Sequence, residues 1–158
     1  MLALLAAASL IQTAPVPPPE AAPAHSFVLT GAGRFAVLAD LSTIRREGDI
    51  AEMRALQVSD NSFTVAGVAY WGGWSRWRFD CAAHTADRLD FASLRESGVE
   101  GPSTLEPSPA YPAVPGGDAA ELLDVACSTT PRTADVTTLE EAVRLGRAAV
   151  AGDLDPPR

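Results

Sequence analysis

The stretch YWGGWSRWRFDC, residues 70–81, contains all three tryptophans of the chain and one of its two cysteines. Because side chains alternate between the two faces of a β-strand, Trp77, Phe79 and Cys81 share one face. Aromatic side chains bury about 150–250 Å² each and often anchor a core. The pattern therefore predicts a strand whose Trp77 face packs inward and carries Cys81.

The other aromatic and basic residues of this stretch form a candidate ligand contact. They are Trp71, Trp74, Arg76 and Arg78. An exposed tryptophan beside arginines can hold a sugar or an acidic peptide by stacking and charge. The alternative is that Trp74 covers a helix or the sheet edge, so the exposure of Trp74 decides between the two interpretations.

The two cysteines, Cys81 and Cys127, most simply form a disulfide if the chain is exported. Closing the loop between them is worth roughly 4 kcal/mol in the chain-entropy model, a large share of the stability of a small domain. The alternative is a pair of separate buried thiols.

On both sides of this stretch, short apolar segments alternate with turn signals, which is typical of an antiparallel sheet. The expected strands are residues 27–30, 34–39, 50–58, 63–70, 74–82 and 87–94. We expect a tight turn at residues 40–44, where the Asp40 carboxylate accepts backbone N–H groups two or three residues later. Gly67 indicates a bulge and Gly72-Gly73 a break between strands. Residues 96–117, rich in Pro, Gly and Ser, predict a long loop.

Helical patterns appear only after this loop. Asp118 and Glu121 fit a capping box, and an apolar stripe of period three to four follows them. Cys127 lies one turn beyond Leu123, at the edge of that stripe. The first helix therefore presents its cysteine close to the face that it buries.

A second helix is expected over residues 138–151, capped by Thr137 or Thr138 with Glu140 and Glu141 as partners. It either packs on the same domain or serves as an interaction arm. Strands first and helices last predict an α+β fold with an antiparallel sheet of about six strands.

The N-terminal segment has the features of a secretory signal peptide. Its apolar run, residues 2–11, spans roughly 15 Å as a helix and is too short for about 30 Å of hydrocarbon. Ala22-Pro23-Ala24 offers a small-residue cleavage site before His25, although no Arg or Lys precedes the run. We therefore expect a periplasmic or secreted protein without a transmembrane span in the mature chain.

The chain divides into three predicted parts. Residues 1–24 are the signal peptide and a Pro/Ala-rich segment, residues 26–128 are the main domain, and residues 129–158 are a C-terminal helical extension. An apolar fraction of 47% is enough for a modest core. The net charge of −8 disfavours nucleic acid as a partner, because an acidic chain repels phosphates.

The residues offer little for catalysis or cofactor binding. The chain has no lysine, which excludes a lysine Schiff base and a P-loop lysine. His84 with Asp87 and Asp90 is a loose metal candidate, but one His and two Asp in a turn rarely supply the geometry that a metal needs, so a solvated turn is the favoured interpretation. Gly31-Ala32-Gly33 lacks the third glycine of a dinucleotide loop and fits a hairpin turn. We predict no catalytic residue, metal or cofactor, and a small hydrolase is the least favoured alternative.

Three segments together resemble the surface-adhesin protein E family of small exported bacterial proteins. They are DLSTIRREGD (residues 40–49), WRFDC (77–81), and YPAVPGG (111–117) running into ELLDVAC (121–127). The resemblance covers most of residues 26–128 and rests on the order and spacing of the segments. It implies an antiparallel sheet with a C-terminal helix tethered to it by the disulfide.

The best-known member of that family binds host extracellular-matrix proteins. The resemblance therefore implies a non-catalytic envelope protein with an extracellular or envelope protein as its partner. A second hypothesis is a small-molecule or glycan-binding periplasmic module that uses Trp71 and Trp74. The sequence does not predict an oligomeric state.

Overall fold

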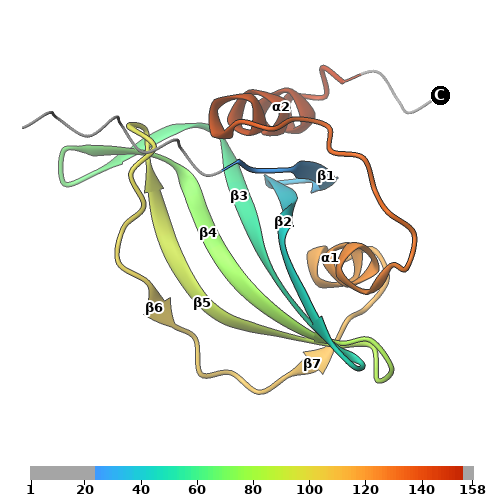
Figure 1. Cartoon of the computed structure of the whole chain (residues 1–158). Helices are drawn as coiled ribbons and strands as arrows, with labels where there is room; N and C mark the ends of the chain where they lie inside the picture. Colours follow the sequence, from blue (N-terminus) through green and yellow to red (C-terminus); the bar gives the residue numbers. More distant parts are fainter. Residues whose placement is uncertain (1–23, 155–158) are drawn as a thin grey trace, which may run out of the picture.

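The computed structural model describes residues 24–154. Its elements are β1 (Phe27–Ala32), β2 (Phe35–Glu47), β3 (Ile50–Val65), β4 (Val68–Asp80), β5 (Thr85–Arg95), β6 (Thr104–Leu105), β7 (Tyr111–Pro112), α1 (Asp118–Cys127) and α2 (Leu139–Ala151). The strands pair antiparallel in the order β1-β2-β3-β4-β5-β6, and β7 pairs the other end of β5 (Figure 1). The predicted α+β fold, with an antiparallel sheet and two helices after it, is confirmed.

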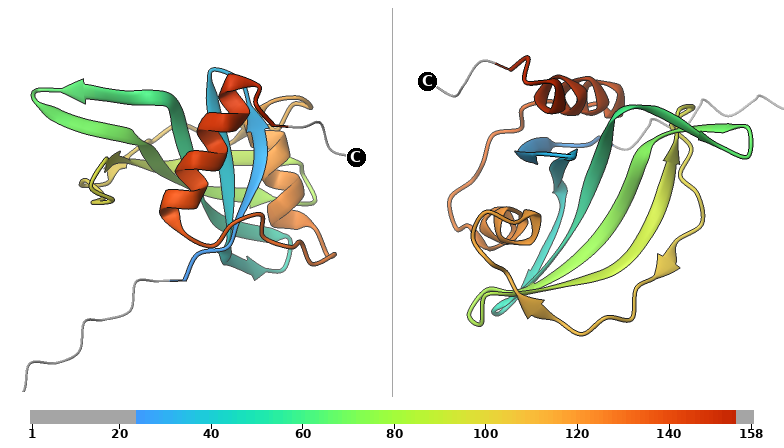
Figure 2. Two further views of the ribbon diagram at one scale, coloured as in Figure 1. Left: turned by 90° about the horizontal axis from the view of Figure 1, so that it is seen from above. Right: turned by 180° about the vertical axis from the view of Figure 1, so that it is seen from behind.

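The two helices cover opposite faces of the sheet. Val37 and Ala39 of β2 belong to the core beneath α1, whereas Ala36 and Leu38 belong to the core beneath α2. Seen from above, α2 lies in front of β1 and β2 and α1 lies beyond them (Figure 2). We call these sides of the sheet the α1 face and the α2 face.

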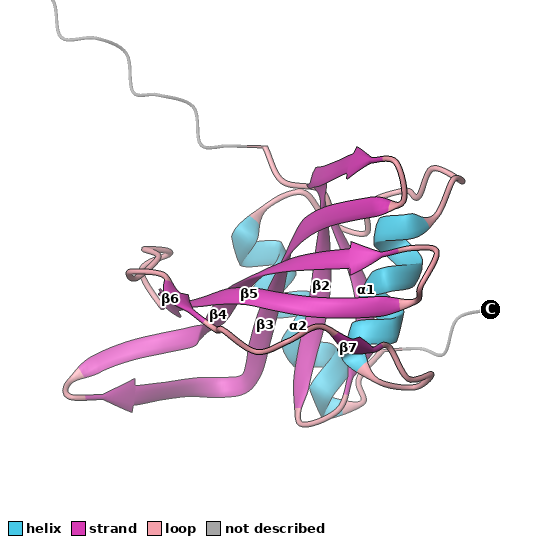
Figure 3. Ribbon diagram, turned by 90° about the horizontal axis from the view of Figure 1, so that it is seen from below, coloured by secondary structure: helices cyan, strands magenta, loops and turns pink. Residues whose placement is uncertain are grey.

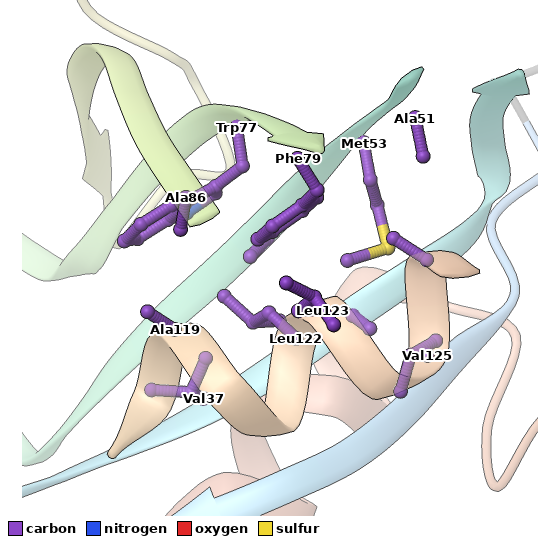
Figure 4. Close-up of a cluster of buried hydrophobic side chains, with 13 residues drawn as sticks. Val37, Ala51, Met53, Trp77, Phe79, Ala86, Ala119, Leu122, Leu123 and Val125 are labelled. Carbon is purple, nitrogen blue, oxygen red and sulfur yellow. The ribbon is translucent and has the colours of Figure 1, made fainter. Parts of the chain in front are cut away.

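The core of the α1 face is built around two aromatic rings of β4. Trp77 and Phe79 are 8% and 0% exposed, and their ring centroids lie 6.0 Å apart. Leu122 and Leu123 of α1 pack in the same cluster, on the helix side of these rings (Figure 4). The predicted inward face of β4 is confirmed.

A disulfide joins Cys81, just after β4, to Cys127 at the end of α1. The two Cα atoms are 5.6 Å apart, and both cysteines pack against the α1-face core. The disulfide prediction is confirmed, and so is the tether between sheet and helix.

The core of the α2 face contains Phe27, Leu56 and Trp74. The helix approaches the strands closely, because a Cβ atom added at Gly146 would lie 3.0 Å from the Val58 Cβ and 3.1 Å from the Ala36 Cβ. Of the two alternatives for the second helix, the structure shows packing on the same sheet.

The segment before α2 also binds the first strand. The Phe27 N–H donates to the Val136 carbonyl at 2.9 Å, and the Asp135 N–H donates to the Phe27 carbonyl at 2.8 Å. The Leu29 N–H donates to the Asp135 carboxylate at 2.8 Å. Hydrogen bonds therefore join the first strand of the described chain to the segment that leads into its last helix.

The expected break at Gly72-Gly73 is wrong, because β4 continues through both residues. A Cβ atom at Gly72 would lie 1.9 Å from the Gln57 carbonyl oxygen, and one at Gly73 would lie 2.2 Å from the Phe91 ring. These glycines are needed for close packing within the sheet, so they do not end the strand.

Two further local predictions are corrected. Gly67 is not in a bulge: with Ala66 it forms the two-residue turn between β3 and β4, both residues having positive φ (79° and 48°). Residues 40–44 stay within β2, where the register shifts between Asp40 and Arg45. The predicted acceptor is confirmed, since Asp40 Oδ1 accepts the Ser42 N–H at 3.1 Å.

The helix caps agree with the sequence for one helix only. Thr138 and Glu141 form the capping box of α2. The N-cap of α1 is Gly117, without a side-chain cap, so the box predicted for Asp118 and Glu121 is wrong. The helix begins one residue earlier than that box requires, and Asp118 becomes its first residue.

The predicted signal peptide lies almost entirely outside the described residues and stays a prediction. Within residues 24–154, no helix is both long enough and apolar enough to cross a membrane. The Cys81–Cys127 disulfide is of the kind that forms in oxidising compartments outside the cytosol.

Candidate functional site

A cavity of about 560 Å³ opens on the α1 face, beside the start of α1. Its volume lies within the range of about 300–1,000 Å³ that is common for small-molecule sites. The sheet supplies the floor: Val37, Ala55, Gln57, Ser75, Trp77 and Arg88. The loop after β6 and the first turn of α1 supply the walls: Glu106, Ser108, Tyr111, Pro112, Val114, Gly117, Asp118 and Ala119.

The cavity exists because small side chains line the floor next to the point where α1 begins. Ala55 and Ser75 are paired neighbours on β3 and β4, and both are at least 95% buried. The helix begins at Asp118, so its apolar stripe covers Met53 and Phe79 and leaves this end of the face uncovered. Small side chains without a helix above them leave a hollow.

A bulge in β5 directs Arg88 to this cavity. Arg76 pairs with Asp90, but Trp77 pairs with Arg88, so Leu89 is an extra residue in β5. Without the extra residue, Arg88 and Asp90 would share a face. With it, Arg88 lies on the cavity side, and its Nε donates to Glu106 Oε2 at 2.6 Å.

The loop wall is held at both ends by very short strands. Strand β6 pairs with Asp90 and Phe91 of β5, and β7 pairs with Thr85 and Ala86. Between these strands the chain runs as a loop along the sheet (Figure 3). The predicted long loop at residues 96–117 therefore contains two anchored strands and forms one wall of the cavity.

Tyr111 of β7 brings a phenol to the cavity wall. Burial raises the pKa of Tyr111, and Asp118, Asp87 and Glu106 raise it further, while Arg88 lowers it. The net shift is upward, so the phenol stays protonated at neutral pH and can donate a hydrogen bond.

The predicted aromatic and arginine contact lies on the other face. Trp74 is only 3% exposed, between the guanidinium of Arg54, 4.5 Å from the indole centroid, and the rings of His25 and Phe27. Trp74 is therefore a core side chain, which corrects its proposed role as an open stacking surface. Trp71 is half-buried against the same core.

The arginines of that contact remain at the surface. Arg76 is exposed and its Nε lies 3.3 Å from Asp90 Oδ2. Arg78 is exposed and pairs in register with Glu52 and Asp87. With Trp74 buried, a ligand role for Trp71, Arg76 and Arg78 stays a prediction without a platform to support it.

A buried polar cluster on the α2 face explains part of the DLSTI segment. Asp40 is 0% exposed, and its carboxylate contacts His25 Nδ1 at 2.7 Å and accepts the Ser42 hydroxyl at 2.6 Å. It also accepts the Ser26 N–H at 3.2 Å. The cluster ties the entering chain to β2, which is a structural role.

The metal candidate around His84 finds no support. Residue 84 lies exposed in the turn after β4, with a positive φ of 54°. Within residues 24–154, no three His, Cys, Asp or Glu side chains are grouped as a metal ion would require.

Sequence reasoning missed most of the cavity. Gln57, Ser75, Arg88 and Tyr111 were not singled out, and Asp118 was noted only as a helix cap. Two small residues on neighbouring strands, Ala55 and Ser75, were the available signal, but it requires the strand register. The bulge that redirects Arg88 has no glycine or proline to mark it.

Comparison with protein-family models, with curated proteins and with solved structures found no match.

Proposed function

We propose that this protein is an exported, non-catalytic binding domain that takes a small ligand into the cavity whose floor includes Trp77. The observation that carries the proposal is the cavity itself, which joins an apolar floor to a few polar groups. Pockets with this mixture are typical of ligand sites. The disulfide and the expected signal peptide support export.

The composition of the lining supports binding rather than nucleophilic chemistry. The lining residues include no histidine, cysteine or lysine, and the only arginine is held by Glu106. Neither serine of the lining has a histidine there to act as its base. Trp77, Val37 and Ala55 instead supply an apolar surface on which a ligand body can lie.

The proposal can be tested with Nile red, an uncharged apolar dye whose fluorescence rises in apolar surroundings. Ala55→Leu fills the floor and should weaken dye binding severalfold, measured by fluorescence titration. The control is Arg78→Ala, an exposed change on the α2 face, which should leave binding unchanged. Equal binding by wild type and Ala55→Leu, with both variants folded by circular dichroism, would contradict a site in this cavity.

A second candidate function, contact with an extracellular-matrix protein, is favoured by the tip of the β3–β4 hairpin. Phe63 and Val65 are 44% and 56% exposed and pair with Tyr70 and Val68. Paired residues share a face, so the four form an apolar patch. Exposed apolar patches are common at protein interfaces.

This second candidate has its own test. Phe63→Ser with Val65→Ser should abolish binding to immobilised matrix proteins, whereas Thr64→Ala, on the opposite side of the hairpin, should not. Binding that survives the double change would remove the hairpin from the interface.

A further inference from the structure

We propose that the cavity selects a small organic cation, a molecule with a positively charged nitrogen on an apolar or aromatic body. This inference rests on the proposed function, since it specifies the ligand of the same cavity. Three features of the lining support it: an excess of carboxylates, polar side chains on the floor, and an indole ring beside them.

The charged lining residues are one arginine and two acids. Arg88 is already neutralised by Glu106, whose Oε2 lies 2.6 Å from the Arg88 Nε. Asp118 has no ion-pair partner among the residues that the structure describes. The lining therefore carries one carboxylate without an ion-pair partner, on an exposed side chain of the first turn of α1. Charge of one sign along a cleft raises the local concentration of ions of the opposite sign.

The floor contains two polar side chains. Ser75 is 5% exposed and lines the cavity. The half-buried amide of Gln57, two strand positions from Ala55 on the same face, lines it too. Both offer acceptor oxygens to the N–H groups of an ammonium.

The indole of Trp77 in the floor suits the same ligand. The Arg88 guanidinium carbon lies 6.0 Å from the indole centroid, so this ring already has a cation as a neighbour. Cations within about 6 Å of an aromatic face are attracted to it, and tryptophan is the strongest partner. The lining therefore offers a carboxylate, a hydroxyl and an indole to an ammonium, and Val37 and Ala55 to its apolar body.

The test compares three probes that share a phenylethyl body and differ in the charge of the head group: 2-phenylethylammonium, 2-phenylethanol and 3-phenylpropionate. Isothermal titration calorimetry of the full chain should show the cation binding roughly tenfold more tightly than the alcohol, and the anion most weakly. Asp118→Asn should reduce the preference for the cation over the alcohol severalfold. Asp124→Asn, on the same helix but outside the cavity lining, is the matched control and should leave it unchanged.

The outcomes separate this inference from the proposed function. Equal binding of cation and alcohol, both weakened by Ala55→Leu, would overturn the charge preference and leave the cavity as a site. Tighter binding of the anion would overturn the inference as well. No binding of any probe, together with unchanged Nile red binding in Ala55→Leu, would overturn both proposals. Asp124→Asn acting as strongly as Asp118→Asn would show that only net charge matters and would also overturn the assignment.

Discussion

The two faces of the sheet are built from alternate residues of the same strands, yet they differ in how they are filled. On the α2 face, Trp74, Leu56 and Phe27 occupy the space under the helix, and Gly146 lets the helix backbone come close. On the α1 face, Ala55 and small neighbours leave a cavity where the helix begins. The difference shows that the size of alternate side chains, together with the helix position, decides whether a sheet face becomes core or site.

The sharpest test of this comparison exchanges the tryptophans of the two faces for alanine. Trp74→Ala should cost about 3–5 kcal/mol of unfolding free energy, because packed side chains enclose it on every side. Trp77→Ala should cost less, since part of that ring borders an existing hollow. Denaturant unfolding followed by far-UV circular dichroism measures both, and a larger loss at Trp77 would break the comparison.

Loss of the disulfide should lower the stability of the whole domain and loosen the α1 face first. The double change Cys81→Ser with Cys127→Ser should cost about 2–4 kcal/mol, because it releases a loop in the unfolded chain. Amide hydrogen exchange should rise in α1, which the disulfide ties to the sheet, before it rises in α2. Equal loss of protection in both helices would mean that the two faces do not open separately.

Adding volume to each face sharpens the comparison further. Ala36→Leu on the α2 face should cost about 1–3 kcal/mol by overpacking, because the Gly146 backbone packs directly against the Ala36 Cβ. Ala55→Leu should cost clearly less, because its added atoms enter the cavity. Thermal unfolding of both variants checks this, and a greater loss for Ala55→Leu would show that the cavity closes in solution.

The smallest expected effect concerns the helix caps. Thr138→Ala removes the side-chain cap of α2 and should cost about 1 kcal/mol. Hydrogen bonds from the Thr138 side chain and the Thr137 backbone lower the pKa of Glu141. The ionised carboxylate therefore stabilises the fold fully above the usual glutamate pKa of about 4.3, and this contribution disappears as the pH falls through the lowered value.

Glu141→Gln should remove this part of the pH dependence, measured as unfolding free energy between about pH 6 and pH 3. Glu121→Gln, in α1 without a cap hydrogen bond, is the control and should leave the profile unchanged. An identical effect of both changes would contradict the role of the α2 cap.

Strand alternation was enough to predict the sheet and the inward face at Trp77, and the presence of two cysteines in an expected exported chain was enough to predict the disulfide. The site was less accessible. The neighbours Arg76 and Arg78 left the exposure of Trp74 open, and His25 and Phe27, far away in the sequence, cover it. Such cover depends on tertiary packing and leaves no mark in a local pattern.

The wrong local predictions within the strands have a common physical cause. A glycine in a strand predicts a break or a bulge, whereas Gly72 and Gly73 continue β4 because a side chain there would collide with the Gln57 carbonyl and the Phe91 ring. The bulge at Leu89 carries no such residue, yet it decides on which face Arg88 lies. Register depends on pairs of strands, and a single strand read alone does not contain it.

The hydrogen bonds between Phe27 and residues 135–136 have a consequence for the time course of folding. The first strand is completed by a segment that is synthesised more than a hundred residues later, which takes on the order of ten seconds at about 5–20 residues per second. We expect the nascent chain to stay open for that interval, with Phe27 uncovered and available to chaperones. Until residues 135–136 have been made, β1 lacks the backbone partners that hold Phe27 in the finished fold.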